Sequence, residues 1–287
     1  MKIFDPHVHM TSRTTDDYEA MAAAGVLAIV EPAFWLGQPR TSVGSFVDYF
    51  NGLVGWERFR ASQFGIRHFC TIGLNPKESN NPKVAGDVLA MLPRWLEKDG
   101  VVAVGEVGYD DQTDAEEVSL MKQLELAREF DLPVLIHTPH RDKKRGTERT
   151  LAVLREVQFP EPLALIDHNN EETLPLVLRT DCWAGHSIYP DTKMDEARMV
   201  ELVRRYGPAR ILVNSAADWG ISDPLKVPKT AAAMRAAGIA EADIARIFWD
   251  NPVAFFGQSG RLELPVEKPA TEPLYQGNSI LRGQAAR

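Results

Sequence analysis

Eight short apolar runs of β-favouring residues alternate with longer amphipathic stretches, and this alternation limits the chain to few folds. The runs cover residues 2–4, 26–30, 68–72, 101–105, 133–136, 163–166, 182–184 and 211–213. The clearest helical patterns cover residues 84–98, 116–130, 148–157, 195–206 and 228–237. Continuous apolar strands separated by helices are typical of parallel strands buried on both faces. Eight such units in 287 residues predict an α/β fold, a (β/α)8 TIM barrel, with a doubly wound open sheet as the alternative.

The connection between the second and third runs is unusually long and rich in aromatic residues. It spans residues 31–67 and contains Phe34, Trp35, Phe46, Tyr49, Phe50, Trp56, Phe59 and Phe64. This content predicts a helical insertion over 33–64, either a lid on the active-site face or an added core-packing helix. Beyond about residue 263 the chain is rich in Pro, Gly and polar residues. We therefore expect a barrel domain over 1–262 and an extended tail over 263–287.

Charge and composition narrow the class of protein. Lys and Arg number 32 against 40 Asp and Glu, a formal net charge of −8. Such a chain is a poor general binder of nucleic-acid phosphates, although a local basic cleft is compatible with it. Its two cysteines fit a reducing compartment, its first residues lack the apolar segment of a signal peptide, and no run of about 18 apolar residues occurs. The sequence predicts a cytoplasmic protein outside the membrane and leaves the oligomeric state open.

Polar residues follow most of the predicted strands at the point where each strand ends. Five of the seven histidines lie there, and they are His7, His9, His137, His168 and His186. Carboxylates lie at similar points, with Glu106 after the fourth run and Asp218 shortly after the eighth. Catalytic residues of such barrels gather at the carboxyl ends of the strands, and imidazole with carboxylate is a common donor set for divalent metals.

Each of these residues also has an ordinary structural interpretation. In extended backbone, His7 and His9 point to the same side and can reach one ion, but they can equally be polar residues of a turn. Glu106 ends an apolar strand, where a buried carboxylate needs a cation, and a salt bridge would serve as well as a metal. His137 and His168 taken singly fit satisfied core histidines. Their joint placement at strand ends favours a metal site.

Several motifs together resemble the TatD family of metal-dependent hydrolases, a branch of the amidohydrolase-like barrels. They are Asp5-Pro6-His7-Val8-His9, Gly105-Glu106-Val107-Gly108-Tyr109-Asp110, Gln123 to Glu129 running into Leu132-Pro133-Val134-Leu135-Ile136-His137, and Asn251-Pro252-Val253-Ala254-Phe255-Phe256-Gly257. The resemblance spans roughly residues 1–257, and the combination is far more specific than any single motif.

The resemblance implies a site with two divalent metal ions, zinc first, with manganese, nickel or magnesium as alternatives. His7 and His9 would hold one ion, His137 and His168 the other, and Glu106 would bridge them. A water or hydroxide between the ions would be the nucleophile.

The chain departs from the family pattern after its third and eighth strands. Asp218, which would complete the first ion's ligands and accept a proton, lies later than the family's Glu-Thr-Asp run, and Asp223 is the fallback. The alternative for Asp218 is a cap or turn residue. Asn75 stands where the family commonly has a histidine near the substrate.

Further polar residues are candidates for substrate binding. His140 and Arg141 begin a basic stretch after the fifth strand, which could receive an anionic substrate or be a solvated loop. His186 either contacts substrate, orients a ligand or is a core histidine. By position alone, the pocket-lining aromatic candidates are Tyr109, Tyr189 and Trp219.

The predicted function is metal-dependent hydrolysis of an ester, phosphoester or amide-type bond in a small molecule. The net charge and the Asn75 substitution disfavour the runner-up, a TatD-like deoxyribonuclease. A metal-binding barrel without catalytic activity is a further alternative, and it would lack the acid that activates the nucleophile. A third is a barrel decarboxylase or a phosphoesterase of the polymerase-histidinol type, which would need a late Asp-x-His pair that this sequence lacks.

Overall fold

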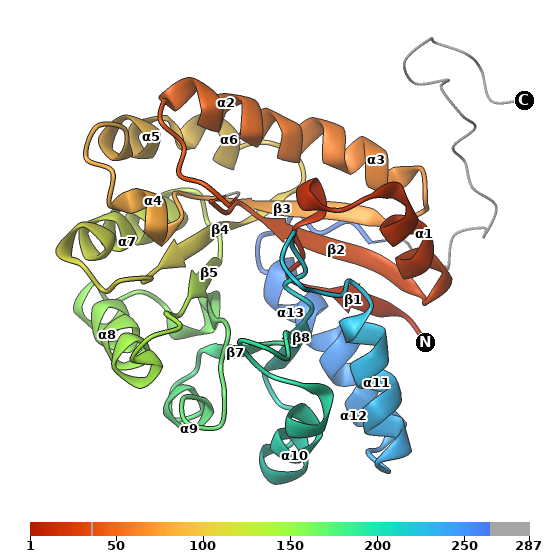
Figure 1. Ribbon diagram of the computed structural model, residues 1–287. Helices are drawn as coiled ribbons and strands as arrows, with labels where there is room; N and C mark the ends of the chain where they lie inside the picture. The colour runs from red at the N-terminus through yellow and green to blue at the C-terminus, as the bar shows by residue number, and fades with distance from the viewer. Residues whose placement is uncertain (36, 265–287) are drawn as a thin grey trace, which may run out of the picture.

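The chain forms an eight-stranded parallel barrel with helices packed around it (Figure 1). The computed structural model describes residues 1–35 and 37–264. Neighbouring strands follow sequence order: β1 (Ile3–Asp5), β2 (Val26–Pro32), β3 (Arg67–Ile72), β4 (Val101–Gly108), β5 (Val134–His137), β6 (Ala164–Ile166), β7 (Trp183–Ser187) and β8 (Ile211–Asn214). Backbone hydrogen bonds of 2.8 Å from Ala216 N to His7 O and from His9 N to Ala217 O join the ends of β8 and β1. The predicted (β/α)8 barrel is confirmed; of the expected tail, residues 265–287 lie outside the described residues.

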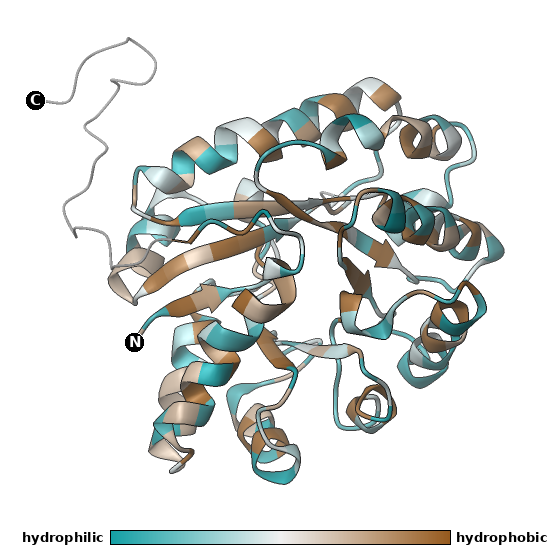
Figure 2. Cartoon of the chain, turned by 180° about the vertical axis from the view of Figure 1, so that it is seen from behind, coloured by the Kyte–Doolittle hydropathy of each residue, from teal (hydrophilic) through white to brown (hydrophobic). Residues whose placement is uncertain are grey.

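The strands are buried on both faces, as their continuous apolar sequences predict. Alternate residues, among them Phe4, Phe69 and Leu212, form one buried cluster with Phe255 and Phe256 of α13 (Asn251–Gly257). The intervening strand residues join a larger core under the surrounding helices. Figure 2 shows the strands mainly in the hydrophobic colour, whereas the helices also carry hydrophilic residues. Polar side chains at the strands' carboxyl ends are therefore exceptions that need a reason.

The remaining α-helices each come after one of the strands in the chain. They are α1 (Thr15–Ala23), α2 (Val43–Asn51), α3 (Arg58–Ser62), α4 (Pro76–Ser79), α5 (Ala85–Met91), α6 (Pro93–Leu96), α7 (Asp114–Glu129), α8 (Lys143–Glu156), α9 (Leu174–Val177), α10 (Glu196–Tyr206), α11 (Lys226–Ala236) and α12 (Glu241–Ala245). Among the helices in the described part of the chain, none is both long and apolar enough to cross a membrane.

Two helices differ from the sequence prediction. The helix expected over 84–98 is divided into α5 and α6 at Pro93, whose missing N–H cannot continue the hydrogen-bond ladder. The helix expected over 148–157 begins five residues earlier, at Lys143, directly after Asp142 in left-handed backbone (φ 46°). The basic stretch expected on a loop therefore forms, in part, the first turn of α8.

The aromatic insertion packs onto the barrel as a helical layer. α2, a π-helical turn (Gly52–Glu57) and α3 follow one another over β2 and β3 (Figure 1). Phe46, Phe50 and Leu53 of this layer are buried. Of the two interpretations offered by the sequence, the core-packing helix describes this layer. The preceding residues Phe34 and Trp35 instead reach the pocket described below.

Candidate metal centre

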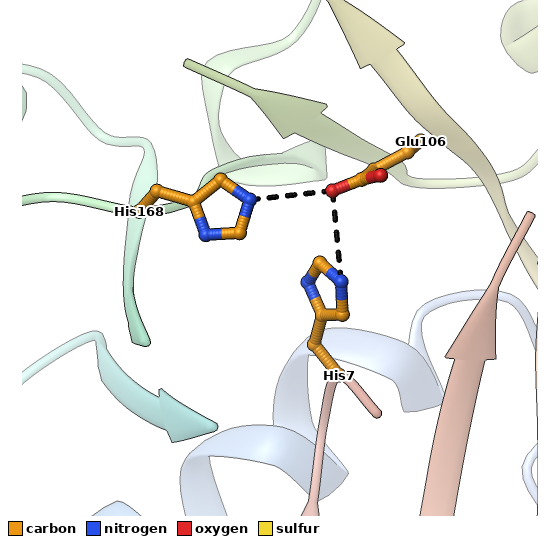
Figure 3. Close-up of side chains that lie close together, drawn as sticks. All are labelled: His7, Glu106 and His168. Carbon is orange, nitrogen blue, oxygen red and sulfur yellow. Dashed lines mark hydrogen bonds and ion pairs between the residues drawn. The ribbon is translucent and has the colours of Figure 1, made fainter. Parts of the chain in front are cut away.

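Three buried side chains converge at the carboxyl end of the barrel. His7 follows β1, Glu106 lies on β4 and His168 follows β6; one potential ligand atom from each lies within 4.8 Å of the others. Glu106 Oε1 is 3.5 Å from His7 Nε2 and 3.3 Å from His168 Nε2. Figure 3 shows the two rings turned toward this carboxylate from different sides. The arrangement concentrates nitrogen and oxygen donors at one point.

His9 and His137 extend this cluster. His9 Nε2 lies 3.0 Å from His7 Nε2, so the two rings of the His-x-His motif do meet. His137 Nδ1 lies 3.3 Å from Glu106 Oε1. All five side chains line one pocket of about 510 Å³. The sequence thus placed five potential donors correctly at a common site, whereas their roles as metal ligands stay predictions.

A buried hydrogen-bond network orients two of the histidines. His7 Nδ1 is 2.6 Å from Asp167 Oδ2, and His168 Nδ1 is 2.6 Å from Ser187 Oγ. Ser187 Oγ donates to Asn214 Oδ1, and Asn214 Nδ2 donates back to Asp167. These partners favour a proton on each Nδ1, so Nε2 is the ring nitrogen that is available to a metal ion beside Glu106.

His168 also has an unusual backbone. Its φ is 60°, a left-handed conformation that non-glycine residues seldom adopt. The Asp167 carboxylate accepts a 2.7 Å hydrogen bond from His168 N, which supports this conformation. Backbone held in such regions often occurs at functional sites. Asp167 therefore fixes both the backbone of His168 and the ring of His7.

The electrostatics of the cluster depend on its burial. Burial alone would raise the pKa of Glu106, but His7, His137 and His168 outweigh it and hold that pKa well below its usual value. Burial lowers the pKa of His168 well below its ordinary value, and the nearby Lys193 lowers it further. An ionised carboxylate beside a neutral imidazole is the donor set that divalent zinc, manganese or nickel binds. The residues present therefore fit a divalent metal.

We expect Asp167→Asn to weaken zinc binding by about 10–100-fold, because it removes the carboxylate that sets the tautomer of His7. Competition for zinc against a chromophoric chelator measures the change. Asp181→Asn, at an exposed carboxylate 3.7 Å from Arg210, is the matched control. Equal zinc affinity in both variants would contradict the positioning role of Asp167.

Asp218 lines the same pocket but lies apart from the His7–Glu106–His168 cluster. Its Oδ1 accepts hydrogen bonds from Tyr189 OH at 3.1 Å and from Gly220 N at 2.8 Å. Burial raises the pKa of Tyr189 to about 12, with a further contribution from this carboxylate. The fallback residue Asp223 pairs with Lys229 and accepts from Leu225 N. Of the two acids, Asp218 is the one at the pocket.

The predicted substrate-binding residues are divided between the pocket and other places. Asn75 lines the pocket and donates from Nδ2 to Glu106 Oε2 at 3.2 Å. His140 also lines it, and burial lowers the pKa of its ring to about 3. Arg141 is exposed and pairs with Asp111, and His186 is fully buried with no hydrogen-bond partner for its ring among the described residues. Neither Arg141 nor His186 is among the described residues that line the pocket.

The three aromatic candidates also differ. Tyr189 lines the pocket. Tyr109 is buried and donates to Glu117 at 2.5 Å, away from the pocket lining. Trp219 is 49% exposed, and its ring centroid is 5.8 Å from that of Phe34. Phe34 in turn stacks on His9, so Trp219 contacts the pocket wall rather than the pocket itself.

Sequence reasoning missed several residues that shape the site. Asp167 and Asn214 stand at strand ends, a position that could have marked them as partners of the histidines. Ser187, the last residue of β7, could have been found in the same way. Lys193 lines the pocket from the loop after β7, and no periodic pattern indicates its position. The position of such a loop residue follows from the folded structure and cannot be read from the sequence pattern.

Comparison with known proteins agrees with this geometry. A protein of Methanocaldococcus jannaschii, described as an uncharacterized metal-dependent hydrolase, is 29% identical over 259 residues, covering 88% of this chain and 99% of that protein. With its barrel and its histidine–carboxylate cluster, the chain is a metal-dependent hydrolase. The model of the family described as TatD related DNase matches residues 4–257, and the chain belongs to this family. The predicted resemblance is confirmed.

One solved structure supports the same assignment, and a second shares the fold. The TatD-like protein of Archaeoglobus fulgidus is 30% identical and superimposes with a TM-score of 0.75, covering 88% of this chain and 99% of that one. A mutant of the phosphotriesterase-like lactonase of Deinococcus radiodurans has a TM-score of 0.67 at 15% identity, covering 89% and 95% of the two chains. The second likeness shows the shared fold alone.

Proposed function

We propose that this protein is a dinuclear hydrolase that cleaves an ester, lactone, phosphoester or amide bond in a small molecule. The observation that carries the proposal is the cluster of His7, Glu106 and His168, whose ligand atoms lie within 4.8 Å in an open pocket. His9, next to His7, and His137, next to Glu106, supply further donors. We assign the activity to the barrel, residues 1–262, with zinc as the first candidate metal.

The proposed chemistry needs a proton acceptor as well as metal ligands. Bound divalent ions would lower the pKa of a water molecule and polarise the oxygen of the reacting carbonyl or phosphoryl group. Asp218 accepts the proton at Oδ2, which makes no hydrogen bond with a described residue. Tyr189 and Gly220 hold the other oxygen, Oδ1, and so fix the direction of the carboxylate.

The pocket's size and lining favour a small substrate. Its volume of about 510 Å³ is in the range of small-molecule sites. Phe34 and Trp35 form an aromatic wall on one side, and Lys77 lies 4.3 Å from the ring of Trp35. The net charge of −8 disfavours extended contact with nucleic-acid phosphates. The deoxyribonuclease in the family's description stays the runner-up, favoured by the basic residues beside the pocket.

The test is a metal-dependent substrate survey with the full-length chain. After chelation, the protein is reconstituted separately with zinc, manganese, nickel and magnesium. Each form is assayed on lactones, carboxylic esters, phosphotriesters, phosphodiesters and single-stranded DNA. We expect turnover of a small molecule that chelation abolishes and metal restores. Preferred cleavage of DNA would establish the runner-up instead.

Asp218→Asn tests the proton acceptor in the same survey. We expect kcat to fall about 100-fold, a typical contribution of a positioned general base. Metal content should stay at the wild-type level if Asp218 acts mainly on the proton. Asp87→Asn, an exposed acid on α5, is the matched control. Metal binding without turnover of any substrate, in wild type and variant alike, would reject the hydrolase proposal.

A further inference from the structure

A second pocket adjoins the metal centre. Its volume is about 610 Å³, and it shares His140, His168, Thr192 and Lys193 with the first pocket. Residues of the first turn of α8 also line it. We call it the lysine pocket, because Lys143, Lys144 and Lys193 line it. A molecule that occupies both pockets would pass directly beside His168.

Lys193 stands at the junction of the two pockets with an uncompensated charge. Among the described residues, no carboxylate lies within the 4.0 Å ion-pair distance of its ammonium group, and none accepts a hydrogen bond from it. Its contact is with the ring of Tyr189, 5.1 Å from the ammonium. Burial lowers the pKa of Lys193, opposed by the more distant Glu106, Asp167 and Asp218. A half-buried cation without a partner is costly unless a ligand supplies the counter-charge.

The start of α8 adds positive potential to the same pocket. No side chain of a described residue caps this 14-residue helix, and its first turn has no acidic residue. Helix N-termini carry partial positive charge and free N–H groups, which bind anions. Lys143 Nζ donates to Thr138 Oγ1 at 3.0 Å, and burial lowers the pKa of Lys143 to about 8. The helix end and the lysines thus face the same cavity.

Three carboxylates also line the lysine pocket and oppose the positive charge of the lysines. Asp142, Glu148 and Glu172 are all exposed, and water and salt screen exposed charges strongly. Lys143 and Lys193 are half-buried, so their field within the pocket is screened less. The half-buried charges, which act most strongly inside the cavity, are therefore positive.

We propose that the lysine pocket binds an oxyanion of the substrate, a phosphate ester or a carboxylate, while the bond to be cleaved lies at the metal centre. The proposal rests on the proposed function and names its substrate class: a small molecule with an anionic group remote from the reacting bond. Lys193 and the first turn of α8, which line the same pocket, both bind that group. Lys193 is then a specificity residue, separate from the metal ligands.

Binding of inorganic phosphate to the full-length chain tests this proposal without any hydrolysis. Isothermal titration calorimetry is run on the metal-free and the zinc-loaded protein, with acetate as a parallel probe that separates carboxylate from phosphate preference. We expect Lys193→Met to weaken phosphate or acetate binding at least about tenfold in both forms. Lys144→Met, at an exposed position, should weaken it by a smaller factor and serves as a second variant.

Lys122→Met, an exposed lysine of α7, is the control with the same change of net charge, and it should bind both probes as the wild type does. The proposal is overturned if, in the metal-free chain, Lys193→Met and Lys122→Met bind the probes with equal affinity. It is also overturned if the wild type binds neither phosphate nor acetate. Because the readout is binding, a failed substrate survey would leave this result standing, and the two failures are distinguishable.

Discussion

Glu106→Gln is expected to remove bound metal and to lower hydrolytic turnover at least about 10³-fold. Metal lowers the pKa of a bound water from about 15.7 to about 7, so loss of the ion removes most of the nucleophile at neutral pH. Glu106 Oε1 is the atom that His7, His137 and His168 all approach, at 3.3–3.5 Å. An amide there brings no negative charge and loses attraction for a divalent cation. Elemental analysis and steady-state kinetics measure both effects.

Glu125→Gln is the matched control for this prediction, because it makes the same substitution at an exposed position of α7. It should retain wild-type metal content and turnover. Thermal unfolding of the metal-free proteins shows whether each variant still unfolds in one cooperative transition, and so separates loss of ligand from loss of fold. A Glu106→Gln protein that keeps full metal content and full turnover would show that this carboxylate is no ligand.

The cluster of metal-donor side chains could be predicted from the sequence, because residues at the carboxyl ends of barrel strands lie close together. His7, Glu106, His137 and His168 each stand at or just after the end of an apolar run, and barrel closure brings such ends together. No knowledge of loop structure is needed for that inference. Asp218 differs, because it lies four residues beyond β8 in a loop that includes the left-handed Ala216 (φ 43°). Its place at the pocket but outside the cluster depends on that loop.

The features that sequence reasoning did not find depend on long-range contacts. The partners of the histidines come from β6, β7 and β8, so no local pattern links Asp167, Ser187 and Asn214. Lys193 reaches the site from a loop, and α8 begins at Lys143, directly after Asp142 in left-handed backbone. The spacing of apolar residues indicates which face of a helix is buried, but it does not define the residue at which the helix begins. The lysine pocket is built from these two features.

The pocket's aromatic wall rests on a buried ion pair that sequence analysis also did not find. Arg40 Nη1 lies 2.7 Å from Glu78 Oε2, and the two side chains are 6% and 1% exposed. Arg40 Nη2 donates to Phe34 O at 3.0 Å, and the guanidinium packs against the rings of Phe46 and Tyr49. One side chain thus joins the helical insertion, α4 and the segment that carries Phe34.

Arg40→Met is expected to lower the free energy of unfolding by about 3–5 kcal/mol, because it leaves the Glu78 carboxylate buried without its partner. Burial already raises the pKa of Glu78 even with Arg40 present, and removal of the guanidinium raises it further. A carboxyl group with a raised folded-state pKa binds more protons when folded, so acidification favours the folded protein. The loss should therefore be largest above neutral pH and shrink toward pH 5. Denaturant titrations at several pH values measure it.

The double variant Arg40→Met/Glu78→Gln separates a buried charge from lost packing. Replacing both partners removes the unpaired carboxylate, so much of the stability should return, whereas a pure packing defect would persist. Arg205→Met, at an exposed arginine of α10, should stay within about 0.5 kcal/mol of the wild type. If Arg40→Met is as stable as Arg205→Met at every pH, the ion pair does not hold the insertion against the barrel. The aromatic wall would then depend on the apolar contacts of Phe46 and Phe50.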